Sequence, residues 1–471
     1  MIRKTKIVCT LGPAIDSVEA LTKMIEAGMN VARLNFSHLS NDDALVKIEN
    51  VRKAEKIMNK PIPIMLDTKG PEIRIGLFEN GEAKISKGDI IKILPNEIIG
   101  NNKEFSISYP ELYNDLNIGD EILIDDGNIK LSVQTLENNI ITCLVENDGV
   151  LKNRKGINVP STKLSMPFIS EKDYNDIKFG CEHGIDLIAL SFVRRAEDVL
   201  EVKELLKKFG KPKIEIIAKI ENQEGLDNID EILNVANGVM VARGDLGVEV
   251  QAEMVPFYQK QIVSKANALG KPVIIATHML ESMIKNPRPT RAEASDVANA
   301  ILDGCDAIML SGESAVGKYP YESVEMMDRI AKTAEKMFNY KNFLWKDSSF
   351  VFENQNDAIG ICACECAASL DNVVAIIAFT ETGGTAKRIC RFKPSVPLIA
   401  CTDSIDTSRR LSYYCGVIPV SAKYIDNISL CDDIAIQAAK KFGFKKGSKI
   451  ILTGGFGVEH GITNTIRIIE L

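Results

Sequence analysis

The stretch IEIIAKIENQEGLDNIDEILNVANGVMVARGD, residues 214–245, contains two short apolar runs that each end in charged residues. We expect Ile214–Ile220 and Gly238–Arg243 to be β-strands, because both runs are short and rich in β-branched residues. Their nearly continuous hydrophobicity is typical of parallel strands that are covered on both faces. The sequence at their carboxyl ends reads Lys219-Ile220-Glu221 and Arg243-Gly244-Asp245.

The same unit recurs along much of the chain, with longer amphipathic stretches between the apolar runs. Strands that alternate with helices form parallel sheets, and eight such strands match a (β/α)8 barrel, or TIM barrel. The predicted strands are Lys6–Leu11, Val31–Phe36, Ile62–Thr68, Leu187–Ser191, Ile214–Ile220, Gly238–Arg243, Pro272–Thr277 and Ala307–Leu310. The predicted helices include Ser17–Ala27, Asp42–Met58, Ala196–Phe209 and Pro256–Leu269. A capping box at Thr290 and Glu293 marks the start of another helix.

The alternation stops after the third strand. Residues 70–167 contain many short strand-like runs and turn signals, such as Asn80-Gly81 and Asp126-Gly127, and no long helical pattern. We expect a small all-β domain, inserted at the carboxyl end of a barrel strand, where it can act as a lid. Residues 341–471 alternate again and predict a C-terminal α/β domain. Residues 1–69 and 168–340 would then form the catalytic barrel.

Length and composition limit the class of protein. The 471 residues are 45% hydrophobic and 26% charged, which excludes a disordered chain and suits roughly two to four domains. The net charge of −7 argues against a nucleic-acid or anionic-membrane binder, because both depend on basic surfaces. Eleven irregularly spaced cysteines fit free thiols, and neither a signal peptide nor an apolar run of membrane-spanning length is recognised. We therefore expect a cytoplasmic protein.

Polar residues gather where the predicted barrel strands end. In a (β/α)8 barrel these ends meet on one face, which carries the active site. Cations able to neutralise phosphate or carboxylate oxygens are Arg33, Lys69, Lys219 and Arg243. Hard oxygen ligands suited to Mg2+ or Mn2+ are Glu221 and Asp245. A weakly charged, oxygen-rich group suited to a monovalent cation consists of Asn35, Ser37, Asp67 and Thr68. Phosphoryl transfer fits this set, because it depends on positioning and charge neutralisation.

A second candidate site lies in the predicted C-terminal domain. The loop Thr380-Glu-Thr-Gly-Gly-Thr385 follows a predicted strand and opens a predicted helix. Free N–H groups and the hydroxyls of Thr380, Thr382 and Thr385 are suited to holding a phosphate there. A plain glycine turn explains the same residues equally well, so both interpretations stay open.

Six long motifs resemble the pyruvate kinase family, and the resemblance is collinear over essentially the whole chain. They are MNVARLNFSH (29–38), MLDTKGPEIR (65–74), IIAKIEN (216–222), VMVARGDLGVE (239–249), NPRPTRAEASDVANAILDG (286–304) and IMLSGES (308–314). The resemblance implies transfer of a phosphoryl group from phosphoenolpyruvate to ADP, giving pyruvate and ATP, with Mg2+ (or Mn2+) and K+ as cofactors. It also implies a homotetramer under allosteric control through the C-terminal domain, with a sugar phosphate or AMP as candidate effector.

The resemblance also assigns roles by matched position. The catalytic residues would be Lys219, Arg33 and Thr277. The substrate would be bound by these three together with Gly244 and Asp245. The ligands of Mg2+ would be Glu221 and Asp245, and those of K+ would be Asn35, Ser37, Asp67 and Thr68. The nucleotide would contact Asn35, His38, Arg74 and Lys155. An effector phosphate would contact Thr380, Thr382 and Thr385.

Departures from the family pattern bear on these roles. Glu72 matches the K+-dependent form, but Ile75 replaces the threonine that usually accompanies it. Gly384 replaces a basic residue often found in the effector loop, so the identity of the effector does not carry over. Two other functions stay open: a catalytically silent metabolite-binding regulator, and a phosphoenolpyruvate-using barrel enzyme with His38 or His278 as phosphate carrier.

Overall fold

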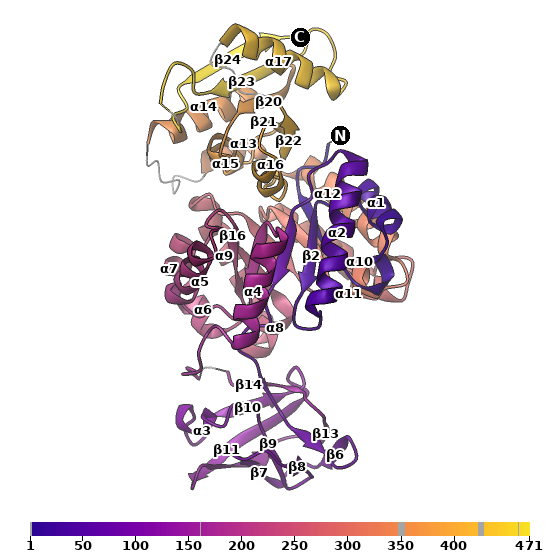
Figure 1. Ribbon diagram of the computed structural model, residues 1–471, viewed down its shortest axis with the longest axis vertical. Helices are drawn as coiled ribbons and strands as arrows, with labels where there is room; N and C mark the ends of the chain where they lie inside the picture. The colour runs from indigo at the N-terminus through magenta and orange to yellow at the C-terminus, as the bar shows by residue number, and fades with distance from the viewer. Residues whose placement is uncertain (1, 161, 347–353, 423–427, 460) are drawn as a thin grey trace.

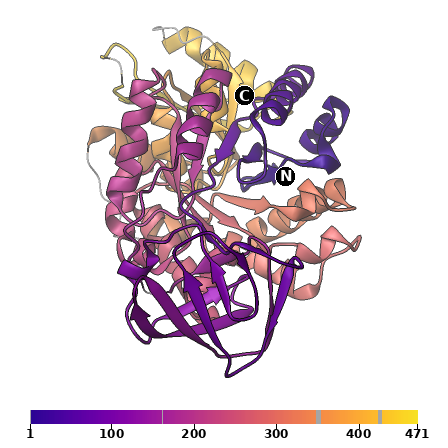
Figure 2. The same ribbon diagram turned by 60° about the horizontal axis from the view of Figure 1, so that its bottom comes forward.

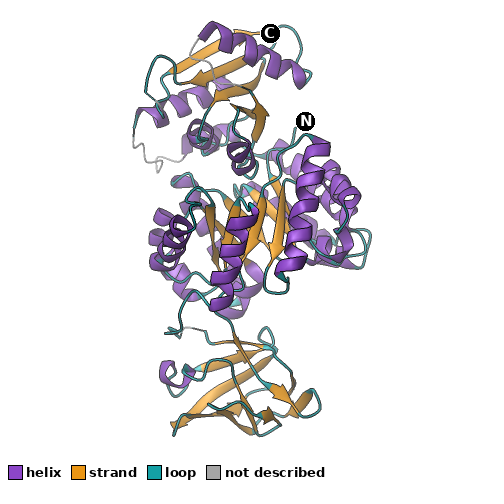
Figure 3. Cartoon of the chain, viewed as in Figure 1, coloured by secondary structure: helices purple, strands orange, loops and turns teal. Residues whose placement is uncertain are grey.

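The computed structural model describes residues 2–160, 162–346, 354–422, 428–459 and 461–471. In Figure 1 these residues form three stacked bodies, with the C-terminal domain above a central barrel and a β-rich domain below it. Figure 3 shows that strands dominate the lowest body, whereas helices surround the strands of the central one. Among the described helices, none has the apolar length that a bilayer-spanning segment requires.

Within the described residues, eight parallel strands close the predicted barrel in chain order. They are β1 (Lys6–Thr10), β2 (Val31–Asn35), β3 (Ile64–Asp67), β15 (Leu187–Leu190), β16 (Glu215–Ile220), β17 (Gly238–Ala242), β18 (Val273–Ala276) and β19 (Ala307–Leu310). Nearly all their residues are buried, which confirms that both faces are covered. The predicted strands extend one residue too far at most carboxyl ends, because the chain leaves the sheet there to present polar side chains.

Several of the outer helices begin at a side-chain N-cap, such as Ser40 and Thr290. The longer ones are α1 (Val18–Ala27), α2 (Asn41–Met58), α4 (Glu171–His183), α5 (Ala196–Lys208), α9 (Val255–Ala268), α10 (Arg291–Leu302) and α12 (Pro320–Met337). The capping box of α10 is confirmed, because Thr290 and Glu293 each bond the other's backbone N–H. Short helices follow several strands, namely α6 (Gln223–Asp227), α7 (Ile229–Val235), α8 (Arg243–Glu249) and α11 (Gly312–Ala315).

The chain leaves the barrel after β3 and forms the β-rich domain before it returns at α4. The largest sheet in the described part of this domain has the order β4-β14-β10-β11-β12-β7-β9. These strands are β4 (Ile73–Arg74), β7 (Ile90–Leu94), β9 (Glu104–Ser106), β10 (Glu121–Ile124), β11 (Ile129–Glu137), β12 (Ile140–Val145) and β14 (Gly156–Asn158). The single helix seen among its described residues is the short α3 (Leu112–Asp115). Figure 2 shows the domain in front of the barrel end from which it emerges.

The C-terminal domain contains the predicted second α/β unit. Its sheet has the order β22-β21-β20-β23-β24, in which β24 is antiparallel to β23 and the other pairs are parallel. The strands are β20 (Val373–Phe379), β21 (Leu398–Thr402), β22 (Val417–Ser421), β23 (Lys449–Gly454) and β24 (Thr465–Glu470). The helices are α14 (Gln355–Ser369), α15 (Gly384–Cys390), α16 (Ile405–Leu411) and α17 (Ile428–Lys441), with α13 (Tyr340–Lys346) ahead of them.

Buried ion pairs attach the C-terminal domain to the amino end of the barrel. Lys393 Nζ lies 2.7 Å from Asp306 Oδ1, next to the first residue of β19, and both side chains are about 5% exposed or less. Glu215, the first residue of β16, accepts a hydrogen bond from Tyr413 at 2.6 Å and pairs with Lys387. The two ends of the barrel therefore differ in use: one end packs against the C-terminal domain, and the other faces the β-rich domain.

We predict that Asp306→Ala lowers the free energy of unfolding by about 3–5 kcal/mol, because Lys393 is left buried without a partner. Burial alone would lower the pKa of Lys393, but the Asp306 carboxylate outweighs it and raises that pKa above its usual value. The pair therefore stabilises fully at neutral pH, and its contribution disappears only as the pH rises through the Lys393 pKa. Chemical denaturation measures the loss. Asp306→Ala/Lys393→Met is the control, and equal losses in single and double variants would contradict the prediction.

Candidate active site

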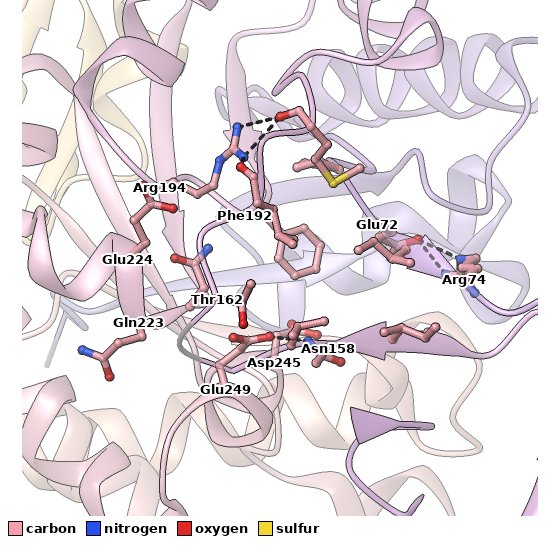
Figure 4. A pocket seen from close by; sticks show the side chains of 18 of the residues that line it. Glu72, Arg74, Asn158, Thr162, Phe192, Arg194, Gln223, Glu224, Asp245 and Glu249 are labelled. Carbon is pink, nitrogen blue, oxygen red and sulfur yellow. Dashed lines mark hydrogen bonds and ion pairs between the residues drawn. The ribbon is translucent and has the colours of Figure 1, made fainter. Parts of the chain in front are cut away.

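A cavity of about 530 Å³ lies between the β-rich domain and the carboxyl end of the barrel. Figure 4 shows Asn158 of the β-rich domain beside Asp245 and Glu249 of α8, with Arg74 and Glu72 at another side of the view. Asn158 donates a 2.7 Å hydrogen bond to Glu249, so the two bodies touch directly where both residues line the cavity. His38, Phe192 and Asn222 also line it from the barrel side.

A buried charge cluster is connected to this cavity through Glu221, which bonds the backbone N–H of Phe192 and precedes Asn222, although the residues of the cluster do not line the cavity themselves. Arg33 Nε of β2 bonds Asp67 Oδ2 of β3 at 2.6 Å, and Lys219 Nζ of β16 lies 3.1 Å from Asp67 Oδ1. Lys219 Nζ also lies 2.9 Å from Glu221 Oε1. All four side chains are less than 10% exposed. The carboxyl ends of three strands thus place two cations and two carboxylates together, as the barrel geometry predicts.

Burial and ion pairing shift the pKa values of these groups in opposite directions. Burial would raise the pKa of Asp67, but Arg33 and Lys219 outweigh burial and hold that pKa below its usual value. Burial raises the pKa of Glu221 to about 7, although Lys219 opposes the shift. Burial would lower the pKa of Lys219, but Asp67 and Glu221 raise it above its usual value. Lys219 therefore stays charged at neutral pH.

The bonding of Glu221 fits a divalent cation. Its Oε2 accepts the backbone N–H of Phe192 at 2.6 Å, and its buried Oε1 lies 2.9 Å from Lys219 Nζ in the ion pair. Asp245, on the first turn of α8, lines the adjoining cavity. Within the described residues, no group of three or more His, Cys, Asp or Glu side chains is assembled for a metal. Two carboxylates completed by substrate oxygens and water are the arrangement that Mg2+ accepts.

The predicted monovalent-cation residues lie on adjacent strands, where Asn35 of β2 pairs in register with Asp67 of β3. Asn35 Oδ1 accepts the Ser37 backbone N–H at 3.2 Å, and Thr68 Oγ1 accepts the Ser191 backbone N–H at 3.0 Å. Both Asp67 carboxylate oxygens are bonded to cations of the cluster. This oxygen-only, nearly neutral group matches the chemistry of a monovalent cation, with Asp67 already committed to Arg33 and Lys219.

Thr277 lies just past β18, and its hydroxyl oxygen accepts the backbone N–H of Gly244 at 2.7 Å. The predicted residues Thr277, Gly244 and Asp245 therefore meet at neighbouring strand ends. Arg243 is predicted as a further cation for phosphate, and its guanidinium bonds Asp296 of α10 at 2.7 Å and the Thr277 carbonyl oxygen at 2.9 Å. In the structure it is therefore held by α10 and by the Thr277 turn, as Arg33 and Lys219 are held by Asp67.

The predicted nucleotide residues are brought only partly together. His38, Arg74 and Lys155 line the same cavity, whereas Asn35 is not among its lining residues. Both cations have partners within the β-rich domain, because Arg74 bonds Glu72 at 2.7 Å and Lys155 bonds Asp125 at 2.6 Å. Ile75, which departs from the family pattern, is buried in the core of that domain.

The predicted effector loop belongs to the C-terminal domain, away from this cavity. Thr380 Oγ1 accepts the Gly383 backbone N–H at 3.0 Å. The Thr385 hydroxyl shares a 2.9 Å hydrogen bond with Thr463, and Thr382 is exposed. The three hydroxyls therefore lie on one loop, two of them already bonded within the domain.

The sequence-based site omits residues from two strand ends. Ser191, at the end of β15, accepts a 2.7 Å hydrogen bond from Lys219 Nζ, and its hydroxyl donates to the Thr68 carbonyl oxygen at 2.7 Å. Thr10, at the end of β1, accepts from Arg33 Nη1 at 2.8 Å. In both cases a polar residue at the end of a strand was the sequence signal that could have identified the site residue. Phe192 holds Glu221 through its backbone, so its side chain carries no such signal.

Comparison with known proteins identifies this arrangement. Residues 2–324 match the family described as "Pyruvate kinase, barrel domain", and residues 357–469 match "Pyruvate kinase, alpha/beta domain". The chain belongs to the pyruvate kinase family. It is therefore a phosphotransferase, with the barrel and C-terminal α/β domain of that family.

Relatives within the pyruvate kinase family align over nearly the full chain. The pyruvate kinases of Bacillus licheniformis and Geobacillus stearothermophilus are 49% and 48% identical, over 99% of this chain and 80% of each relative. The crystal structure of a pyruvate kinase from Cryptosporidium parvum is similar with a TM-score of 0.94 at 39% identity. That match covers 99% of this chain and 96% of the other.

We predict that Ser191→Ala lowers the phosphotransferase rate about tenfold, because Lys219 Nζ loses an acceptor that fixes its position. Ser323→Ala is the matched control, since Ser323 is also fully buried but bonds the Tyr319 carbonyl oxygen within α12. Both variants should lose about 1 kcal/mol of stability in thermal unfolding. Equal rates in the two variants would remove Ser191 from the site.

Proposed function

We propose that the chain transfers the phosphoryl group of phosphoenolpyruvate to ADP, forming pyruvate and ATP in the last step of glycolysis. The observation that carries this proposal is the buried cluster of Arg33, Asp67, Lys219 and Glu221 beside the cavity that Asp245 lines. Two polyanions repel each other as they approach. Fixed cations in a closed site of low dielectric constant offset that repulsion.

In this proposal the substrate is held at both ends. Arg33 and Lys219 bind the phosphate, and the backbone N–H groups near Gly244 and Asp245, with the Thr277 hydroxyl, bind the carboxylate. When the phosphorus–oxygen bond breaks, Lys219 stabilises the negative charge left on the enolate oxygen. The new bond forms to the terminal phosphate oxygen of ADP. Thr277, with ordered water, then relays a proton to the enolate carbon.

Glu221 and Asp245 hold Mg2+ or Mn2+ in this site. The ion supplies positive charge to the phosphate and enolate oxygens. The position of the buried Glu221 carboxylate, next to Asn222 of the cavity that Asp245 lines, supports this assignment. K+ is held by Asn35, Ser37, Asp67 and Thr68. Glu72 matches the K+-dependent form of the family, whereas Ile75 departs from the pattern of that form.

The nucleotide binds between the two bodies. Arg74, Lys155 and His38 face its phosphates as residues 70–167 close as a lid, and Asn35 approaches from the barrel side. The shared cavity and the Asn158–Glu249 contact support a lid that meets α8, the helix that carries Asp245. Closure also keeps water from competing for the phosphoryl group. Residues 1–69 and 168–340 form the catalytic barrel in this proposal.

A coupled assay with phosphoenolpyruvate, ADP, Mg2+ and K+ tests the reaction. We expect turnover in the wild-type chain and a loss of at least about 1000-fold in Lys219→Ala, because the developing charge loses its cation. Circular dichroism should show that the variant remains folded. No turnover in folded wild-type protein would reject the function, and near-normal turnover in Lys219→Ala would remove Lys219 from its role.

We further propose a cytoplasmic homotetramer whose C-terminal domain, residues 341–471, binds a phosphorylated effector at Thr380, Thr382 and Thr385. Family membership supports the tetramer, and eleven free cysteines support a reducing compartment. A sugar phosphate or AMP fits the hydroxyl-rich loop chemically.

An activity screen with and without K+, across sugar phosphates and AMP, tests the two sites separately. We expect activity to fall when K+ is replaced by a large organic cation, because the oxygen group of Asn35 and Asp67 then lacks its ion. We expect one phosphorylated compound to shift the substrate response, and Thr382→Ala to weaken that shift while basal activity is kept. Thr333→Ala, which changes a threonine on α12, is the control. A K+-independent rate, or an effector response that Thr382→Ala leaves intact, would contradict the respective proposal.

A further inference from the structure

The turn that carries Thr277 has an unusual backbone. Thr277 and His278 are consecutive residues with φ of 66° and 53°, in the left-handed region. That region is costly for a β-branched residue such as threonine, and it persists only where the surroundings enforce it. The conformation of Thr277 therefore needs a source outside its own strand.

Arg243, the residue just past the neighbouring strand β17, bonds the backbone carbonyl oxygens of this turn. Its Nη2 donates to the Thr277 carbonyl oxygen at 2.9 Å, with a longer contact of 3.5 Å to the His278 carbonyl oxygen. Its Nη1 bonds Asp296 Oδ1 at 2.7 Å, which anchors the guanidinium to α10. The Arg243 side chain is 11% exposed. A planar guanidinium suits this task, because its fork holds several acceptors in fixed directions.

The other side of the turn is held by the residue next to Arg243. Gly244 donates its backbone N–H to Thr277 Oγ1 at 2.7 Å, so Arg243 fixes the carbonyl of Thr277 and Gly244 fixes its hydroxyl. A Cβ atom at position 244 would lie 3.3 Å from Thr277 Oγ1, which explains why glycine leaves the close approach open. The Thr277 hydroxyl in turn donates to the Ala276 carbonyl oxygen at 2.7 Å, so Gly244 and the end of β18 together fix where it points.

We infer that Arg243 is a positioning residue that acts on the reaction only through Thr277, and that Asp296 orients Arg243. The inference rests on the proposed function, in which Thr277 binds the substrate carboxylate and relays a proton. Without the guanidinium, the turn relaxes toward negative φ and the Thr277 hydroxyl leaves its place. Because Asp296 neutralises Arg243, the role depends on hydrogen-bond geometry and not on charge offered to the substrate.

A double-mutant cycle tests this dependence. Arg243→Met, Thr277→Ala and the double variant are compared by kcat and KM for phosphoenolpyruvate. We expect Arg243→Met to lower kcat/KM about 10- to 100-fold when Thr277 is present, the usual effect of losing a charged hydrogen bond. In the Thr277→Ala background the same change should cost less than about threefold, because the residue it positions is gone. Arg243→Lys should restore part of the rate, since an ammonium reaches one carbonyl oxygen.

Solvent-proton exchange at the methyl group of pyruvate gives a second readout, because it isolates the proton-transfer step. Arg243→Met and Thr277→Ala should slow this exchange to the same extent. Arg52→Met is the matched control, since Arg52 also bonds backbone carbonyl oxygens and a carboxylate, Asp186, but at the amino end of the barrel. Arg52→Met should change the exchange rate by the same factor whether or not Thr277 is present.

The outcomes separate the inference from the function on which it rests. No turnover in the wild-type chain rejects both. Turnover in the wild type, with losses from Arg243→Met that multiply with those from Thr277→Ala, rejects the inference alone. If Arg243→Met does not fold, Asp296→Ala takes its place in the cycle, because it removes the anchoring acceptor while the arginine stays. Asp296 is 38% exposed, so this change leaves the core intact.

Discussion

Asp67 is the residue on which the site depends, because one buried carboxylate holds both buried cations. Its side chain is 1% exposed and bonds Arg33 and Lys219 through different oxygens. A charge moved from water into a protein interior is costly unless it is paired, and removal of one partner leaves the others exposed to that cost. Asp67 therefore fixes two positive charges at neighbouring strand ends before any anion arrives. Ser191 and Thr10 complete their bonding, so their positions are set by the barrel and not by substrate.

Much of this arrangement follows from sequence pattern alone. Alternating apolar runs and amphipathic stretches predict the barrel, and barrel geometry brings the residues after β2, β3, β16, β17 and β18 to one end. The pattern cannot give the direction of a side chain once it leaves its strand. Arg243 directly follows β17, whereas Lys219 is the last but one residue of β16, and the Arg243 guanidinium bonds Asp296, which lies more than fifty residues later in the chain. Phe192 contributes a backbone N–H, and because this group does not depend on the side chain, the residue type gives no signal of the role.

The two ends of the barrel strands have different roles: one end attaches the C-terminal domain, and the other carries the charge cluster. Residues at the amino ends, such as Glu215 and Asp306, bond the C-terminal domain, while residues at the carboxyl ends carry the charge cluster. β16 shows this directly, because it begins with Glu215 and reaches Lys219 within one strand. Hydrogen bonds to both neighbouring strands keep it in register. The C-terminal domain and the charge cluster thus use opposite ends of the same barrel strands. The residue types needed at one end therefore do not restrict those at the other end.

Arg74 pairs with Glu72 and Lys155 pairs with Asp125, so these cations of the cavity have carboxylate counterions within the protein. An incoming anion must displace these carboxylates, so its affinity is the difference between the contacts it makes and those it breaks. Both pairs are partly exposed and are therefore weak, which keeps the exchange easy. A singly charged ligand gains little from such a swap, whereas a chain of phosphates offers more charge and more acceptor oxygens than the carboxylates it replaces. We therefore expect this cavity to favour polyphosphates over simple acids, because only a strongly charged ligand offsets the loss of both ion pairs.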